Sequence, residues 1–124
     1  MSKPLHILLV DDSSLARIIA RRVVTDLVPD AIIMEAVNGE EAIKKVTAVN
    51  GQVSHVMMDL NMPGIDGFAT ITHILAEYPH CKFALCTANI QDAIASRAHE
   101  MGVSFIPKPI DREKLKTFIL GGGA

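Results

Sequence analysis

Short apolar segments alternate with longer amphipathic stretches along this chain. The apolar segments lie at residues 5–10, 31–34, 53–58, 82–86 and 103–106. Each is nearly continuous in apolar residues, which is typical of parallel strands that are buried on both faces. We therefore predict five short buried strands.

The stretches that follow these segments have apolar residues at helical spacing. Their apolar positions are Leu15, Ile18, Ile19 and Val23; Ala42, Ile43, Val46 and Val49; Phe68, Ile71, Leu75 and Tyr78; Ile90, Ala93, Ile94, Ala98 and Met101; and Leu115, Phe118 and Ile119. The first helix should begin at Ser13 or Ser14, and Arg17, Arg21 and Arg22 fall largely outside its apolar stripe.

Helix boundaries are marked by turn residues. Asn50-Gly51 should end the second helix and Pro79 the third, while the fifth, about ten residues long, should start near Asp111. Five strands alternating with five helices give an α/β fold, a parallel sheet with helices on both faces. We assign residues 1–120 to one domain and expect residues 121–124 to form a flexible Gly-rich tail.

Composition limits the possible functions. The formal net charge is -2, without the basic surplus on which nucleic-acid binding depends. Cys81 and Cys86 lie five positions apart, an odd spacing, so on one strand they face opposite sides and a disulfide is not expected. No signal-like segment or apolar run of roughly 20 residues occurs, which favours a soluble cytoplasmic protein without membrane insertion.

Polar residues that can bind ligands or take part in reactions stand where the predicted strands end. Asp11 and Asp12 follow the first strand, Asp59 the third, Thr87 the fourth and Lys108 the fifth. Ligands of parallel α/β sheets bind outside the carboxyl ends of the strands. Three carboxylates, a hydroxyl and an ammonium group are therefore predicted to converge on one edge.

This group has a definite chemistry. Neighbouring carboxylates repel one another and call for a cation, and Mg2+ suits a site of few protein oxygens completed by water and phosphate. With the charge of a phosphoryl donor neutralised, Asp59 can form an acyl phosphate. Lys108 would place a positive charge on the phosphoryl oxygens, and Thr87 would donate a hydrogen bond to them.

Each of these residues also has an ordinary structural explanation. Asp11 and Asp12 can cap a helix, Asp59 can start a turn, Thr87 can cap the next helix and Lys108 can be solvated. These explanations account for each residue alone. They do not explain why all of them stand at strand ends in chain order.

The same segments resemble the CheY-like receiver domains of bacterial two-component response regulators. The matching segments are Leu8–Ser13, Ala36–Ala42, Met58–Gly67, Thr87–Ala88 and Lys108–Pro109. The resemblance covers essentially the whole chain. It implies a flavodoxin-like, doubly wound sheet with the strand order 2-1-3-4-5 found in CheY.

The resemblance also assigns roles at the acidic edge. Asp59 matches the phosphoacceptor, Asp12 the acid that binds Mg2+ directly, and Asp11 the acid that acts mostly through water. Asn61 matches the position whose backbone carbonyl completes the metal shell.

A second set of matched positions concerns switching. Thr87 matches the switch hydroxyl, and Lys108 the lysine that pairs with the phosphoryl group and precedes a cis bond to Pro109. Phe105 matches the aromatic switch position, although a phenylalanine in a buried strand is also an ordinary core residue. Movement of Thr87 toward the phosphoryl group would leave space into which Phe105 could rotate.

The implied function is that of a stand-alone signalling module in chemotaxis or a phosphorelay. It would receive a phosphoryl group from a sensor histidine kinase or histidine phosphotransfer protein and contact an unknown output protein, as a monomer or a phosphorylation-dependent dimer. It would catalyse only its own phosphorylation and dephosphorylation. The arginines beside Leu15 and Ile18 are either a solvated face or part of the surface that docks the phosphoryl donor.

Two other classes fit less well. A phosphohydrolase with an aspartyl-phosphate intermediate commonly needs a second acid where Asn61 stands. A flavin-binding module would need a hydroxyl-rich phosphate loop where Asp11 and Asp12 stand. The five histidines are scattered without metal-ligand spacing, so we interpret them as ordinary structural or surface residues.

Overall fold

Residues 4–121 are described by the computed structural model, and they form a parallel sheet with the strand order β2-β1-β3-β4-β5. The strands are β1 His6–Val10, β2 Ile32–Ala36, β3 His55–Asp59, β4 Lys82–Thr87 and β5 Ser104–Pro107. The helices are α1 Ser14–Leu27, α2 Gly39–Ala48, α3 Gly67–Glu77, α4 Asp92–Glu100 and α5 Arg112–Leu120. The predicted α/β fold and its strand order are confirmed.

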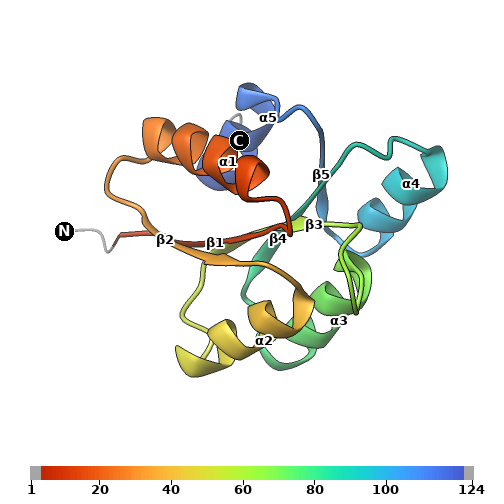
Figure 1. The fold of residues 1–124 in the computed structure, drawn as a ribbon, viewed down its shortest axis with the longest axis horizontal. Coiled ribbons are helices and arrows are strands. Elements are labelled where there is room, and N and C mark those ends of the chain that lie inside the picture. Colours follow the sequence, from red (N-terminus) through yellow and green to blue (C-terminus); the bar gives the residue numbers. More distant parts are fainter. Residues whose placement is uncertain (1–3, 122–124) are drawn as a thin grey trace.

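Two apolar cores lie on the two faces of this sheet. Successive side chains of a strand point to opposite faces, so Leu8 packs toward α2, α3 and α4 while Leu9 packs toward α1 and α5. Figure 1 shows α1 and α5 together on one side of the sheet and α2 and α3 on the other. Cys81 and Cys86 belong to different cores and are both free thiols, as their spacing predicts.

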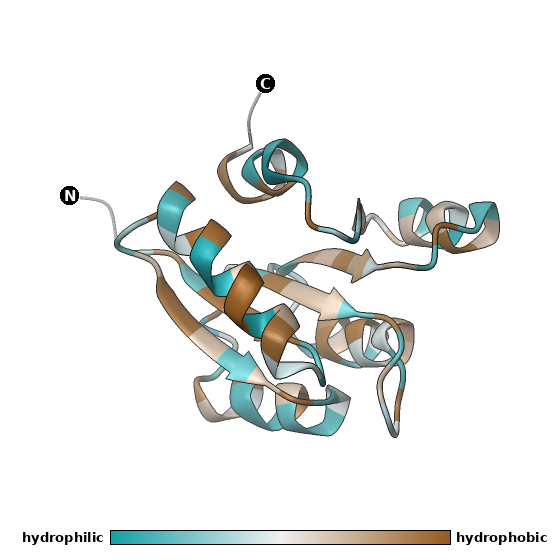
Figure 2. Ribbon diagram, turned by 45° about the horizontal axis from the view of Figure 1, so that its top comes forward, coloured by the Kyte–Doolittle hydropathy of each residue, from teal (hydrophilic) through white to brown (hydrophobic). Residues whose placement is uncertain are grey.

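The predicted apolar stripe of α1 is wrong at three of its four positions, and only Val23 packs against the core. Leu15, Ile18 and Ile19 are 64%, 50% and 47% exposed, and the helix instead buries Ala20 and Val24 against the sheet. Figure 2 shows apolar residues along the outward side of this helix.

The reason for this orientation lies on strand β2. Glu35 points toward α1, and Arg17 and Arg21 form ion pairs with its carboxylate at 2.8 and 2.7 Å. A half-buried carboxylate needs such partners. The helix presents Arg17 and Arg21 to the strand and turns Leu15, Ile18 and Ile19 toward solvent.

Helix boundaries follow the local signals with one exception. Asn50 and Gly51 take positive φ angles of 53° and 74° after α2, and Asp111 caps α5. The exception is Ile90, which was expected in the fourth helix but lies before α4 and is 67% exposed.

Helix α5 is short, as expected, and ends at Gly121. This residue has a φ of 64° and donates its N–H to the carbonyl oxygen of Thr117 at 2.9 Å. The rest of the predicted tail, residues 122–124, lies outside the described residues. Among the described helices, each is too short or too polar to cross a bilayer.

Candidate functional site

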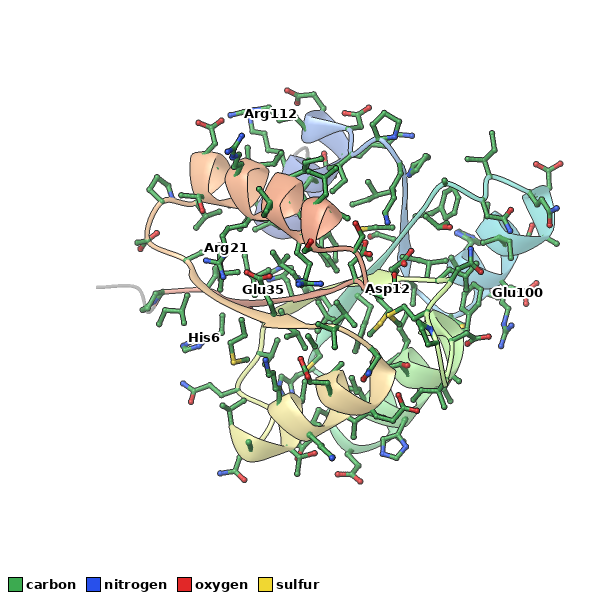
Figure 3. The ribbon with its side chains drawn as sticks, in the orientation of Figure 1. His6, Asp12, Arg21, Glu35, Glu100 and Arg112 are labelled. Atoms are coloured by element: carbon green, nitrogen blue, oxygen red, sulfur yellow. The ribbon has the colours of Figure 1, made fainter. Side chains whose placement is uncertain are left out.

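The carboxyl ends of β1 and β3 bring three acids together. Asp11, Asp12 and Asp59 each offer a carboxylate oxygen, and these oxygens lie within 4.8 Å of one another. Asp11 and Asp59 are each 8% exposed, whereas Asp12 is exposed. Figure 3 shows Asp12 at the edge where β1 leads into α1.

Lys108 completes the cluster from the segment after β5. Its Nζ donates to Oδ2 of Asp11 at 2.7 Å and to Oδ1 of Asp59 at 3.4 Å. Its main-chain N–H donates to the carbonyl oxygen of Thr87 at 2.9 Å, which holds the lysine beside the end of β4. The bond to Pro109 is cis, as the resemblance implies.

The charges of the cluster are not balanced. Three carboxylates and one ammonium group leave two negative charges when all are ionised. Burial raises the pKa of Asp59, and the nearby charges of Asp11 and Asp12 raise it further against the opposing effect of Lys108. Burial lowers the pKa of Lys108, but its hydrogen bond to Asp11 and the charge of Asp59 outweigh this, so its pKa is raised overall.

This donor set fits a divalent cation. The three acids supply hard oxygen ligands, and a cation bound among them would relieve the repulsion that raises the pKa of Asp59. The residues that the sequence proposed as metal ligands are thus compatible with Mg2+. Asn61 lies just beyond β3 and its side chain is exposed.

Thr87 and Phe105 lie on the neighbouring strands β4 and β5. Thr87 is 1% exposed, and its hydroxyl accepts a hydrogen bond from the N–H of Asn89 at 3.0 Å. Phe105 pairs in register with Leu85, two residues before Thr87, so both switch candidates face the α3 and α4 side of the sheet.

The loop after β3 folds tightly over the acceptor strand. Gly67 donates its N–H to the carbonyl oxygen of Leu60 at 3.0 Å, and a Cβ at this glycine would lie 2.4 Å from the carbonyl oxygen of Asp59. Asp66 then caps α3 by accepting from the N–H of Ala69 at 2.8 Å. This close return of the chain holds Asp59 at the start of the loop.

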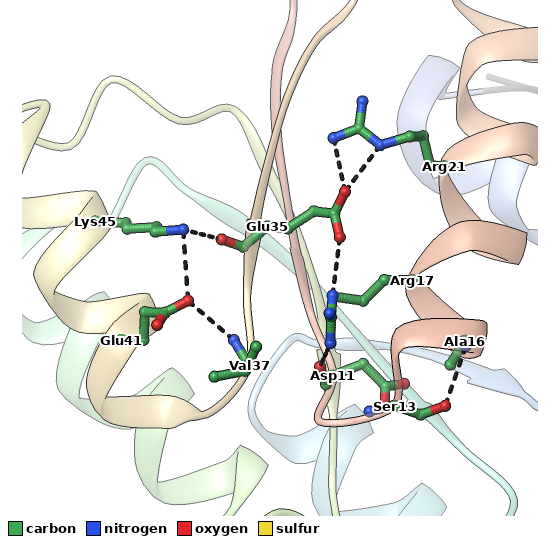
Figure 4. A network of polar contacts seen from close by, with 9 residues as sticks. All are labelled: Asp11, Ser13, Ala16, Arg17, Arg21, Glu35, Val37, Glu41 and Lys45. Atoms are coloured by element: carbon green, nitrogen blue, oxygen red, sulfur yellow. Dashed lines mark hydrogen bonds and ion pairs between the residues drawn. The ribbon is translucent and has the colours of Figure 1, made fainter.

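Arg17 is a neighbour of the site that sequence reasoning missed. Its Nη1 donates to the main-chain carbonyl oxygen of Asp11 at 2.7 Å, while its Nε donates to Oε1 of Glu35 at 2.8 Å. Figure 4 shows this connection from α1 to both strands. The arginine lies six residues after Asp11, outside the segments on which the resemblance rests.

Comparison with known proteins identifies the class. Residues 7–120 match the response regulator receiver domain, and the chain belongs to this family. The chain is CheY-like: it is 32% identical over 112 residues to the chemotaxis protein CheY of Listeria monocytogenes, covering 90% of this chain and 92% of that protein. Receiver domains bind Mg2+ at an acidic pocket, to which the aspartate cluster corresponds.

Larger relatives and solved structures agree with this assignment. The chain is 36% identical over 124 residues to a protein-glutamate methylesterase/protein-glutamine glutaminase of Moorella thermoacetica, covering 95% of this chain but only 28% of that protein. A chain in the crystal structure of the CheX–CheY–BeF3–Mg2+ complex from Borrelia burgdorferi is similar with a TM-score of 0.85 and 26% identity, over 95% of this chain and 88% of that one. A two-component response regulator from Cytophaga hutchinsonii shares the fold with a TM-score of 0.87 and 19% identity, over 97% of each chain.

Proposed function

We propose that this chain is a phosphorylation switch in which Asp59 accepts a phosphoryl group from the phosphohistidine of a sensor kinase or phosphotransfer protein. The observation that carries the proposal is the position of Asp59. Its carboxylate is buried at the carboxyl edge of the sheet, within 4.8 Å of the oxygens of Asp11 and Asp12 and 3.4 Å from Nζ of Lys108. A nucleophile, a set of cation ligands and a fixed positive charge are thereby collected in one place.

Each residue has a separate task in this proposal. The carboxylates of Asp11, Asp12 and Asp59 and the main-chain carbonyl of Asn61 would hold Mg2+, which when bound neutralises and orients the phosphoryl oxygens. Lys108 is already aimed at the acids and would pair with the phosphoryl group on Asp59.

The switch itself would run through Thr87. Its hydroxyl would leave the N–H of Asn89 and donate to the phosphoryl group. Phe105, half-buried on the same face, would then rotate toward the space left behind. The surface of α4 and β5 would change, and with it the contact to an output protein. Phenylalanine has no hydroxyl to hold the inward position, so packing alone would do so.

The outward face of α1 is the surface on which the phosphoryl donor would dock. Leu15, Ile18 and Ile19 are exposed on α1, which begins at Ser14, two residues after Asp12. Apolar side chains of this kind favour a protein contact close to the acceptor. We propose chemotaxis or phosphorelay signalling as the setting of this switch. The compartment would be a reducing cytoplasm, which keeps the thiols of Cys81 and Cys86 free. The domain would catalyse no reaction beyond its own phosphorylation and dephosphorylation.

Intact-mass measurement after incubation with a small phosphodonor tests the proposal. The wild-type protein should gain one phosphoryl group only when Mg2+ is present, and Asp59→Asn should gain none. Asp30→Asn, in the exposed turn before β2, is a matched control that should be labelled like wild type. Labelling that persists in Asp59→Asn, or that does not need Mg2+, would show that the proposal is wrong.

A further inference from the structure

Arg17 links the acidic cluster to a different part of the sheet. Its guanidinium donates to the carbonyl oxygen of Asp11 at 2.7 Å through Nη1 and to Oε1 of Glu35 at 2.8 Å through Nε. Its side chain is only 15% exposed. A planar guanidinium held at two of its donors has little freedom, so the arginine is a rigid connection between β1 and β2.

Glu35 is itself held firmly in place (Figure 4). Its Oε2 pairs with Arg21 from one turn further along α1, and its main-chain carbonyl accepts from Nζ of Lys45 on α2. The hydrogen bond from Arg21 lowers the pKa of Glu35; burial opposes this effect, and the hydrogen bond from Arg17 adds to it, with a net lowering. Arg17 is therefore anchored on a fixed, ionised carboxylate.

The contact at Asp11 concerns the peptide group that joins it to Asp12. Three other polar groups of Asp11 already have partners: its N–H donates to Ala36, Oδ1 accepts from the N–H of Ser13 at 2.9 Å, and Oδ2 accepts from Lys108. The carbonyl is the remaining group, and Arg17 donates to it. Because a peptide unit is planar, fixing this carbonyl also fixes the direction in which the chain leaves toward Asp12.

We propose that Arg17 is a positioning residue for the cation site, holding the Asp11–Asp12 peptide so that both carboxylates face Asp59. The inference rests on the proposed function, because it concerns the cation that phosphoryl transfer to Asp59 would use. It also predicts that Mg2+ affinity changes in the direction opposite to the one that charge alone would give. Removing a positive charge beside three acids should by electrostatics alone strengthen cation binding, whereas loss of positioning should weaken it.

Titration of the metal-free protein with Mg2+ alone, followed by calorimetry, separates the two effects. Arg17→Ala should bind Mg2+ about tenfold more weakly, at the lower end of the range for groups that orient metal ligands. Arg21→Ala is the matched control, since it removes the same charge and a bond to the same Glu35 carboxylate but no contact to Asp11. Its affinity should change much less, and Arg17→Lys should recover only part of the loss, since an ammonium group lacks the guanidinium's fork.

Hydrogen exchange of the Ser13 amide gives a second readout that does not need the metal. This N–H donates to Oδ1 of Asp11, so its exchange should speed up in Arg17→Ala and stay near wild type in Arg21→Ala. Arg17→Met, which keeps the aliphatic stem, gives the same comparison if the alanine variant does not fold.

The outcomes are distinct. Unchanged or tighter Mg2+ binding in Arg17→Ala, or an equal loss in Arg21→Ala, would overturn the positioning role while leaving the proposed function standing. Absence of Mg2+ binding by the wild-type protein would remove both.

Discussion

Replacing His55 with leucine should abolish a loss of stability that the wild-type protein shows in mild acid. His55 opens β3, is only 5% exposed, and forms a T-shaped contact with the ring of Phe118 on α5, with 5.1 Å between ring centroids. Its Nδ1 lies 2.9 Å from Oγ of Ser54, whose hydroxyl donates to the carbonyl of His6. The Ser54 oxygen therefore accepts the Nδ1 proton, and Nε2 is the buried nitrogen for which the described residues offer no partner.

Both burial and a neighbouring positive charge oppose protonation of the His55 ring. Burial lowers the pKa of His55, and the charge of Lys82, its register partner on β4, lowers it further. Its hydrogen-bond partner, the Ser54 hydroxyl, and the neighbouring Phe118 ring carry no negative charge. A proton added at Nε2 would be a charged donor without an acceptor.

The sign and size of the effect follow from linkage. The unfolded chain binds a proton below the ordinary imidazole pKa of about 6.5, while the folded chain resists it. Stability is therefore complete above that pH and falls as the pH is lowered toward the depressed pKa of the folded state. One proton sets a ceiling of about 1.4 kcal/mol per pH unit.

Urea unfolding at about pH 7.5, 6.5 and 5.5 measures this slope. The difference in unfolding free energy between wild type and His55→Leu should change with pH in the stated direction, whatever constant cost the substitution adds. His73→Leu, on the exposed side of α3, is the control that tests whether the effect requires burial. A pH-independent difference for His55→Leu would refute the reasoning.

Two further predictions concern the neighbourhood of the acceptor. Gly67→Ala places a Cβ 2.4 Å from the carbonyl oxygen of Asp59, so it should cost about 1–3 kcal/mol in urea unfolding and slow phosphorylation, and an unchanged midpoint would contradict the close approach. Burial raises the pKa of the Cys86 thiol to about 12, so a thiol-specific reagent near neutral pH should modify this residue only after unfolding. Rapid modification of folded protein at Cys86, read by peptide mass, would mean that the thiol is accessible.

Much of the fold and most of the site could be predicted from the sequence. Continuous apolar runs identify buried parallel strands, and the residues after such runs must stand at the carboxyl edge of the sheet. Asp11, Asp12, Asp59 and Lys108 were placed together on that ground, and the structure brings them together. These inferences depend on local periodicity and on the handedness of crossovers, which the chain carries within each segment.

The orientation of α1 could not be derived in this way. The helix has aliphatic residues around much of its circumference, so spacing alone does not say which of them face the sheet. The choice depends on Glu35, which reaches the helix only because β2 lies beside β1 at the edge of the sheet. In the orientation that brings Arg17 and Arg21 to Glu35, Ile18 is exposed and Ala20 is buried.

Long-range contacts likewise decided the individual character of the site residues. Lys108 lies closer to Asp11 than to Asp59, although the lysine and both acids were simply expected at one edge. The chemical groups that this protein gathers can be read from the chain alone, because strand periodicity and chain order are local properties. How those groups are paired and held emerges only in the folded protein, because it depends on side chains meeting across elements distant in the chain.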